Sequence, residues 1–428
     1  MISNKALVLL IVLAILVATS IHVMAQSNGM TVQEAEQRLL ARNRDILAGR
    51  RAVEVSEANS ISAGARPNPT LSFGVSSINP SAGIGSGPPR DKTVDSSVRV
   101  DQVLERGDKR EMRMAVGKLL ETASAEDLAE ITRQQILAVR QAFYDLLQTQ
   151  EKARVSRDSA ELFQRSVDAM EKRLDAGDVA ASDVARVRVD ALRAARDARS
   201  AEADRRRAQV SLAVLIGAEP EIATLKAAEI WPSPVVADTI MINPEPLERR
   251  PDVRAARKRV EAAQKARDLA RSLRTRDISV GAQYDRYPST PANMTGTGNS
   301  YGLFVSIPLF TNYAFDGEIQ RAEVDFTAAQ DALERSLALA RSDADRARSD
   351  LFSAEDLLQR SVQTLAEAGR AAQAAEFAFD SGAIGVMDLL DSRRTLRALQ
   401  LEASQNRADH AKALAAWQVA AGEISRNP

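Results

Sequence analysis

The chain has 428 residues with a formal net charge of −1, and only 4% of the residues are aromatic. A near-neutral chain offers no electrostatic basis for binding nucleic acid, and the low aromatic content favours long alanine-rich helices over a globular enzyme. The chain contains no cysteine, which excludes disulfides, thiolate metal sites and a lipid attached to an N-terminal cysteine.

Residues 1–25 have the pattern of a secretory signal peptide. Lys5 precedes an apolar run over residues 6–18, and Val23-Met24-Ala25 has the small residues of a cleavage site. An uncleaved anchor helix is the alternative, and in either case the chain leaves the cytoplasm. His410 is the single histidine after this leader, so we interpret it as a buried or surface helix residue and expect no metal site or other cofactor.

A helix is predicted over residues 31–64. Thr31 and Glu34 have the spacing of a capping box at its start, and Pro67 prevents it from continuing. Apolar and polar residues then alternate with the period of a strand. The two strands expected here cover 71–76 and 94–104, with a loop rich in Gly, Pro and Ser at 79–92.

The stretch from Asp108 to Ile216 predicts a long antiparallel helical hairpin. Its outgoing arm of about 70 residues would be ~100 Å long, and a helix of that length needs a partner along its side. Gly177 is suited to the left-handed residue that ends a helix, and Ser182 with Asp183 suits the start of the return arm.

This unit occurs twice. Shifting the numbering by 205 places Gly177 on Gly382 and Gly217 on Gly422, so a second hairpin is expected in the C-terminal half. Further upstream a shift of 207 predicts a helix at 252–273 and strands at 278–285 and 301–309, with a polar loop at 288–299. The chain is therefore divided into a signal peptide at 1–25, a first repeat at 26–217, an equatorial linker at 218–250, a second repeat at 251–423 and a C-terminal tail at 424–428.

Four strands with one apolar and one polar face match transmembrane β-barrel strands, whose lipid-facing and lumen-facing residues alternate. Two short hairpins on a soluble domain are the alternative. That alternative is disfavoured by five side chains polar enough for a watery interior, Asp95, Arg99, Asp101, Gln283 and Asp285. Four strands leave two open edges, which lipid does not tolerate, so a chain that spans must oligomerise. The predicted fold class is mainly α with transmembrane β.

The order and spacing of several short motifs resemble the TolC family of outer-membrane efflux channels. These motifs are Ala65-Arg66-Pro67-Asn68-Pro69 before the first strand, Ile307-Pro308-Leu309-Phe310 at the end of the fourth, and the two turns Arg173-Leu174-Asp175-Ala176-Gly177 and Phe379-Asp380-Ser381-Gly382. The resemblance implies a homotrimer that shares a 12-stranded β-barrel in outer-membrane lipid, continued by a large periplasmic α-helical tunnel.

Residues 102–110 are similar to a segment of the heavy-metal cation efflux branch, of the CzcC type. Asp108 stands where that branch commonly has a second glycine before its Lys-Arg. The resemblance implies an exit duct for heavy-metal cations that works with a periplasmic adaptor protein and an inner-membrane proton-driven pump. A channel for drugs or other small molecules is the alternative, and a periplasmic adaptor or a soluble coiled-coil scaffold would explain fewer of the elements. An enzyme is not expected, because the sequence shows no glycine-rich loop that would cradle a phosphate, and carboxylate pairs are too common on charged helices to indicate acid–base chemistry.

The resemblance also assigns roles to the ends of the hairpins. The tips that contact the adaptor are expected at Gly177, Asp178, Gly382 and Ala383. Asp388 and Asp391 lie three apart on one helix face and match the aspartates of the family's periplasmic gate, with Asp183 as the corresponding residue of the first repeat. In a trimer Asp388 and Asp391 would form two stacked carboxylate rings, and ordinary solvated carboxylates are the alternative. Ile384 stands where the family's well-studied member has a basic residue that ties the gate shut, so a looser closure or a different lock is expected.

Overall fold

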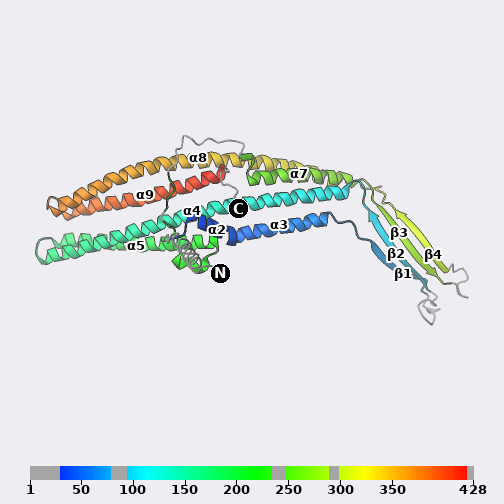
Figure 1. Ribbon diagram of the computed structural model, residues 1–428, viewed down its shortest axis with the longest axis horizontal. Helices are drawn as coiled ribbons and strands as arrows, with labels where there is room; N and C mark the ends of the chain where they lie inside the picture. Colours follow the sequence, from blue (N-terminus) through cyan, green and yellow to red (C-terminus); the bar gives the residue numbers. More distant parts are fainter. Residues whose placement is uncertain (1–28, 79–93, 229, 234–246, 289–297, 422–428) are drawn as a thin grey trace, which may run out of the picture. The chain divides into compact units, whose positions relative to one another are not determined.

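The computed structural model describes residues 29–78, 94–228, 230–233, 247–288 and 298–421 (Figure 1). The expected signal peptide, the loop at 79–92, the C-terminal tail and residues 234–246 of the linker lie outside the described residues. The predicted class, long helices with four strands, is confirmed. The helices are α2 (Val32–Arg42), α3 (Arg44–Ala63), α4 (Lys109–Asp175), α5 (Ala181–Ile216), the 3₁₀ helix η2 (Glu219–Thr224), α7 (Pro251–Ser272), α8 (Asp316–Asp380) and α9 (Val386–Ala420).

The chain divides into two compact units that do not follow the sequence repeats. One unit contains residues 1–49, 129–250 and 339–428, and the other contains residues 50–128 and 251–338. The first therefore holds α2, α5, α9 and the later parts of α4 and α8, while the second holds the strands, α7 and the earlier parts of α4 and α8. Each unit takes segments from both repeats, because a long helix finds its partners in the other copy as well as its own.

The helix predicted over 31–64 is two helices, α2 and α3, separated at Asn43. Thr31 and Glu34 form the expected capping box of α2. Asn43 is extended, with φ −62° and ψ 130°, and its side-chain oxygen accepts hydrogen bonds from the backbone of Asp45 at 3.0 Å and Ile46 at 3.1 Å. Its amide nitrogen donates to the carbonyl oxygen of Leu215 at 2.9 Å. The break has a physical cause, since Asn43 ends one helix, caps the next and binds α5.

The strands form one antiparallel sheet in the order β1 (Thr70–Ser76), β2 (Asp95–Leu104), β3 (Ile278–Tyr287) and β4 (Gly298–Ser306). Phe73, Val98, Tyr284 and Tyr301 are directly opposite one another, so they share one face. Several apolar side chains of that face are largely exposed in the single chain, with Leu303 at 89% and Phe73 at 73%.

The fourth strand differs from its predicted range of 301–309. It begins at Gly298 and ends at Ser306, which pairs with Ser279 near the start of β3. Residues 307–309 have no partner strand beyond that point, although their alternation continues. The alternating sequence therefore predicted that a strand is present. The end of the neighbouring strand β3 determines where β4 ends.

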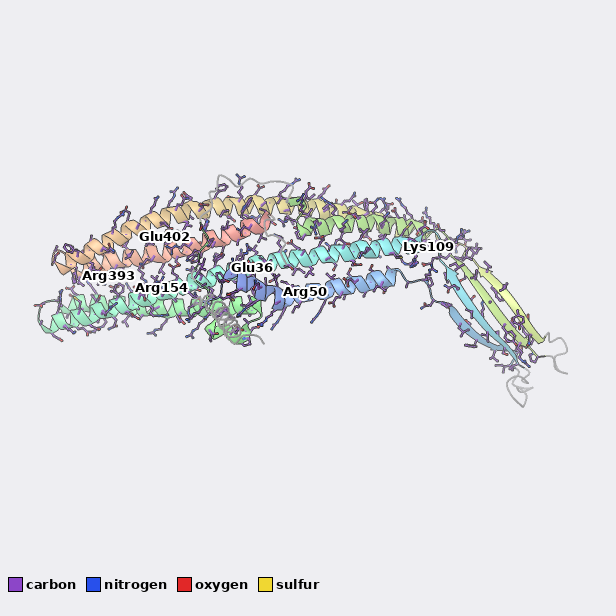
Figure 2. The ribbon with its side chains drawn as sticks, in the orientation of Figure 1. Glu36, Arg50, Lys109, Arg154, Arg393 and Glu402 are labelled. Carbon is purple, nitrogen blue, oxygen red and sulfur yellow. The ribbon has the colours of Figure 1, made fainter. Side chains whose placement is uncertain are left out.

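A buried lysine joins the β2–α4 connection to the α7–β3 connection within the second unit. The ammonium of Lys109, labelled in Figure 2, donates to the carbonyl oxygen of Thr275 at 2.7 Å and to the Asp277 carboxylate at 2.8 Å. Gly107 and Asp108 just before it have positive φ, at 74° and 54°. A left-handed backbone explains why two glycines suit this place, and aspartate is among the few other residues that adopt it readily.

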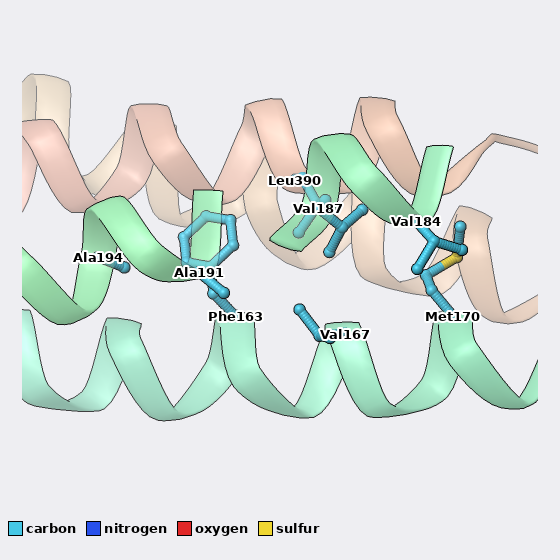
Figure 3. Packing of buried hydrophobic residues seen from close by; sticks show 8 residues of the cluster. All are labelled: Phe163, Val167, Met170, Val184, Val187, Ala191, Ala194 and Leu390. Carbon is cyan, nitrogen blue, oxygen red and sulfur yellow. The ribbon is translucent and has the colours of Figure 1, made fainter. Parts of the chain in front are cut away.

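In the first unit, α5 packs along the later part of α4 through a seam of small and apolar side chains (Figure 3). A buried stripe on α4, which includes Phe163, Val167 and Met170, meets Val184 and Val187 of α5. The spacing of these residues by 3 and 4 positions places them on one face of each helix, and that face is the packing surface.

Trp231, in the linker, stacks on Tyr144 of α4 with ring centroids 6.1 Å apart. His410 is buried in α9, and desolvation lowers its pKa below the ordinary value.

Candidate functional site at the hairpin tips

The first tip is a left-handed helix end built on Gly177. The φ angle of Gly177 is +81°. Its N–H donates to the carbonyl oxygen of Leu174 at 2.9 Å, and the N–H of Asp178 donates to the carbonyl oxygen of Arg173 at 2.9 Å. This pair of bonds is the Schellman arrangement, which satisfies carbonyl groups that the end of α4 leaves unpaired. A Cβ added at Gly177 would meet no atom within 4 Å. The glycine is therefore required by backbone conformation and not by lack of space.

The second tip repeats this geometry on Gly382. Its φ is +75°, its N–H donates to the Phe379 carbonyl at 2.9 Å, and the N–H of Ala383 donates to that of Ala378 at 2.8 Å. The guanidinium of Arg173 lies 5.6 Å from the centre of the Phe379 ring, so the two tips are in contact. The predicted turns at Gly177 and Gly382 are confirmed, while their role in contacting an adaptor stays a prediction.

Asp388 and Asp183 lie in the first turns of the two return helices. Asp388 is exposed, and one of its carboxylate oxygens accepts the N–H of Gly385 at 3.3 Å, which caps the start of α9. Asp183 is half-buried on α5, whose N-cap is Ala180 with no side-chain hydrogen bond. A carboxylate near a helix N-terminus is stabilised by the helix dipole, so both residues have a structural role available in addition to any role in a gate.

Asp391 is exposed and belongs to a charged bridge between the two hairpins. The guanidinium of Arg394 pairs with Asp391 one turn earlier on α9 and with Asp190 of α5. Asp190 is only 12% exposed, whereas Asp391 is 71% exposed. Arg394 thus holds one carboxylate against the hairpin interface while a second remains open to solvent.

Sequence reasoning missed Arg394 and Asp190. The spacing of Asp391 and Arg394 on one helix face could have suggested their pairing. Asp190 is 204 residues away from Arg394, and no local pattern connects them.

Two further interactions join α9 to α5 near the tips. Arg397 of α9 donates to the Asp197 carboxylate at 3.2 Å. Leu390, which is fully buried, packs into the α4–α5 seam (Figure 3). Apolar, ionic and cation–π contacts therefore join the two hairpins near their tips within a single chain.

A groove runs between α4 and the α8–α9 hairpin in the same unit. Its lining is charged: five arginines from α4 and α9 stand near three carboxylates, and Figure 2 labels Arg154 and Arg393 among them. These residues are Arg154, Arg165, Arg393, Arg397, Arg407, Glu151, Asp158 and Glu376. Arg407 bonds Glu151 at 3.2 Å and so links α9 to α4.

The described residues contain no group of three or more His, Cys, Asp or Glu side chains placed to bind a metal ion. Among the described helices, none combines the length and the hydropathy needed to cross a membrane.

Comparisons with known proteins agree with this architecture. Residues 35–218 and 244–423 match the family model of the outer membrane efflux protein. The chain is 24% identical over 382 residues to the cobalt-zinc-cadmium resistance protein CzcC of Cupriavidus metallidurans, which covers 86% of this chain and 84% of CzcC. The structure matches the outer membrane channel CmeC of Campylobacter jejuni with a TM-score of 0.77 at 13% identity, covering 91% of this chain and 85% of CmeC. It matches the outer membrane protein VceC of Vibrio cholerae with a TM-score of 0.74 at 16% identity, covering 91% and 96%.

Two long helical hairpins and a sheet with one apolar and one polar face define the protomer of an outer-membrane efflux channel. The family match covers well over half of the chain, and the chain belongs to the outer membrane efflux protein family. The resemblance to TolC-family channels is thereby confirmed, and the adaptor and scaffold alternatives are set aside. The family consists of channel proteins and not of enzymes.

Proposed function

We propose that three copies of this chain close a 12-stranded barrel in the outer membrane and that their hairpins form a periplasmic tunnel leading into it. The exposed apolar face of the sheet is the observation that carries this proposal, with Leu303, Tyr301 and Phe73 each more than 70% exposed. An apolar face of this size needs a cover, and lipid covers the outer face of a barrel. The outer strands β1 and β4 would pair between copies, which removes the open edges.

The channel is proposed as the exit duct of a tripartite efflux system for heavy-metal cations. Two observations support this substrate class: the relative CzcC is a cobalt-zinc-cadmium resistance protein, and residues 102–110 resemble the heavy-metal branch. The adaptor would contact Gly177, Asp178, Gly382 and Ala383 at the tips, and an inner-membrane proton-driven pump would supply the energy. Asp183, Asp388 and Asp391 would form the periplasmic gate.

Arg394 is proposed as the lock of that gate in this chain. Ile384 provides no charge, and the bridge from Arg394 to Asp190 and Asp391 supplies an ionic tie between the hairpins at the same end. Widening the mouth by moving α9 away from α5 would break this bridge.

The assembly is tested by native mass measurement in mild detergent and by electrophoresis with and without heating. We expect a heat-modifiable trimer, and a monodisperse monomer would contradict the barrel. The substrate class is tested with a deletion strain grown on cobalt, zinc or cadmium salts and on a panel of drugs. Increased sensitivity to the metals is expected, while increased sensitivity to drugs alone would favour a multidrug channel.

A further inference from the structure

The polar face of the sheet carries a cluster built from three strands. Arg99 of β2 is opposite Gln283 of β3, and Asp101 of β2 is aligned through Gly281 with Phe304 of β4. Residues directly opposite in antiparallel strands lie on the same face, so these side chains are neighbours. In the proposed barrel this face lines the lumen, and the inference below rests on that proposal.

The guanidinium of Arg99 is held from two sides. Its Nε donates to the two carboxylate oxygens of Asp101 at 3.0 and 2.8 Å, and its Nη2 donates to one of them at 2.8 Å. Its Cζ also lies 4.3 Å from the centre of the Phe304 ring. A forked ion pair fixes the plane of the guanidinium, and a cation over an aromatic face adds a second attraction.

Two glycines make room for this arrangement. A Cβ at Gly302 would lie 2.9 Å from the Phe304 ring, so the ring lies across the bare backbone of its own strand. A Cβ at Gly281 would overlap the Asp101 carboxylate. The sheet is therefore shaped so that Phe304 and Asp101 lie along the wall, with Arg99 between them.

The charges of this face give the cluster a consequence for transport. Among the described strand residues, Arg99 is the single Lys or Arg on the polar face, which also carries Asp95, Asp101 and Asp285. Three carboxylates and one guanidinium leave a net charge of −2 per copy and −6 in a trimer. Asp285 is 8% exposed and accepts a hydrogen bond from Gln283 at 2.6 Å. A passage with this charge attracts cations, provided that Arg99 stays at the wall.

We infer that Phe304 and Asp101 hold Arg99 flat against the lumen wall, and that Phe304 thereby determines the preference of the barrel for cations. Without the ring, Arg99 is restrained by Asp101 alone, because the second attraction on its guanidinium is lost. The guanidinium then reaches into the lumen and repels cations. The wall of the barrel, in addition to the helix tips, then determines whether cations or anions pass through the channel more readily.

The test is the reversal potential of the intact trimer in planar bilayers under a KCl gradient. Phe304→Ala is expected to shift the reversal potential toward that of a less cation-selective channel, and Arg99→Ala is expected to shift it in the opposite direction. The variant that carries both substitutions should have the reversal potential of Arg99→Ala, because removing the ring has no effect when the arginine is absent. Ser306→Ala, on the same face of β4 but away from Arg99 in the register, is the matched control and should match the wild type.

Two results would overturn the inference. One is a Phe304→Ala channel with the reversal potential of the Ser306→Ala control. The other is a double variant less cation-selective than Arg99→Ala, which would mean that the lost ring acts by widening the lumen. A wild-type protein that forms no channels would instead count against the barrel itself.

Discussion

The two hairpin tips share their backbone geometry and differ in their charges. Each ends in a left-handed glycine with the same pair of hydrogen bonds, and each has an ionic contact between its arms, Glu171 with Arg188 and Glu376 with Arg393, 205 residues apart. Asp183 and Asp388 also correspond. However, Asp391 of the second tip corresponds to Arg186 of the first.

This difference separates what a turn requires from what a gate requires. A reversal between two long helices needs one left-handed residue and partners for the last carbonyl groups, and both copies of the repeat meet that need in the same way. The acidic pair at residues 388 and 391 occurs only in the second copy, together with the bridge from Arg394 to α5. The second hairpin is therefore the one expected to determine gating, and the following experiments test that expectation.

The largest effect is expected from a β-branched residue at either tip. Gly177→Val or Gly382→Val places a side chain on a left-handed backbone, which costs about 1–2 kcal/mol even where the space is open. The turn should deform, and efflux by the assembled system should be lost while the trimer and its insertion into the membrane persist. Metal resistance of the complemented deletion strain measures this, with Gly369→Val as control because that glycine lies within α8 and is also uncrowded. Full resistance in both tip variants would contradict an adaptor contact there.

A smaller effect is expected from neutralising the second tip. Asp388→Asn combined with Asp391→Asn removes two carboxylates per copy, so cation selectivity in planar bilayers should decrease. Asp183→Asn, which changes the first tip alone, should reduce it less. The difference should shrink at high salt, because mobile ions screen exposed charges. Equal selectivity in the wild type and the double variant would refute the gate assignment.

The bridge between the hairpins can be tested with two adjacent arginines. Arg394→Ala removes a contact between hairpins, while Arg393→Ala removes the contact with Glu376 inside one hairpin. Only Arg394→Ala should loosen the contact between the hairpins and raise the single-channel conductance. If Arg393→Ala raises the conductance equally, the effect belongs to general weakening of the helices and not to a lock.

The smallest effect concerns pH and contrasts His410 with its counterpart in the first hairpin, Arg205. Desolvation lowers the pKa of His410, with Glu355 opposing, whereas a hydrogen bond from Arg205 to Glu202 raises the pKa of the guanidinium. The unfolded histidine binds its proton more readily than the folded one. His410 therefore lowers the free energy of unfolding as the pH falls below about 6.5, which is the pKa of histidine in the unfolded chain. Above that pH it has no such effect.

Thermal unfolding in detergent between pH 7.5 and 5.5 measures this dependence. His410→Leu should flatten the loss of stability on acidification relative to the wild type. Arg205→Leu should leave its slope unchanged, because a guanidinium does not titrate in that range. A His410→Leu protein with the wild-type slope would show that folding leaves the pKa of His410 unchanged, and would contradict the expected effect of its burial.

The sequence by itself determined the elements that depend on local backbone chemistry. Alternation over 71–76 and 278–285 predicted strands, Gly177 and Gly382 marked the turns, and the shift of 205 revealed the duplicated hairpin. These features follow from side-chain period and from backbone conformations that glycine adopts without strain, which neighbouring residues alone can show.

Tertiary structure decided the features that depend on residues far apart in the chain. Asn43 divides a predicted single helix because it also binds the carbonyl group of Leu215, and Arg394 reaches Asp190 because α5 and α9 pack side by side. Arg99 finds Phe304 only once β3 lies between their strands in register. Each contact is set by the packing of segments about 170 to 205 residues apart, and sequence periodicity carries no information on which charged side chains such packing brings together.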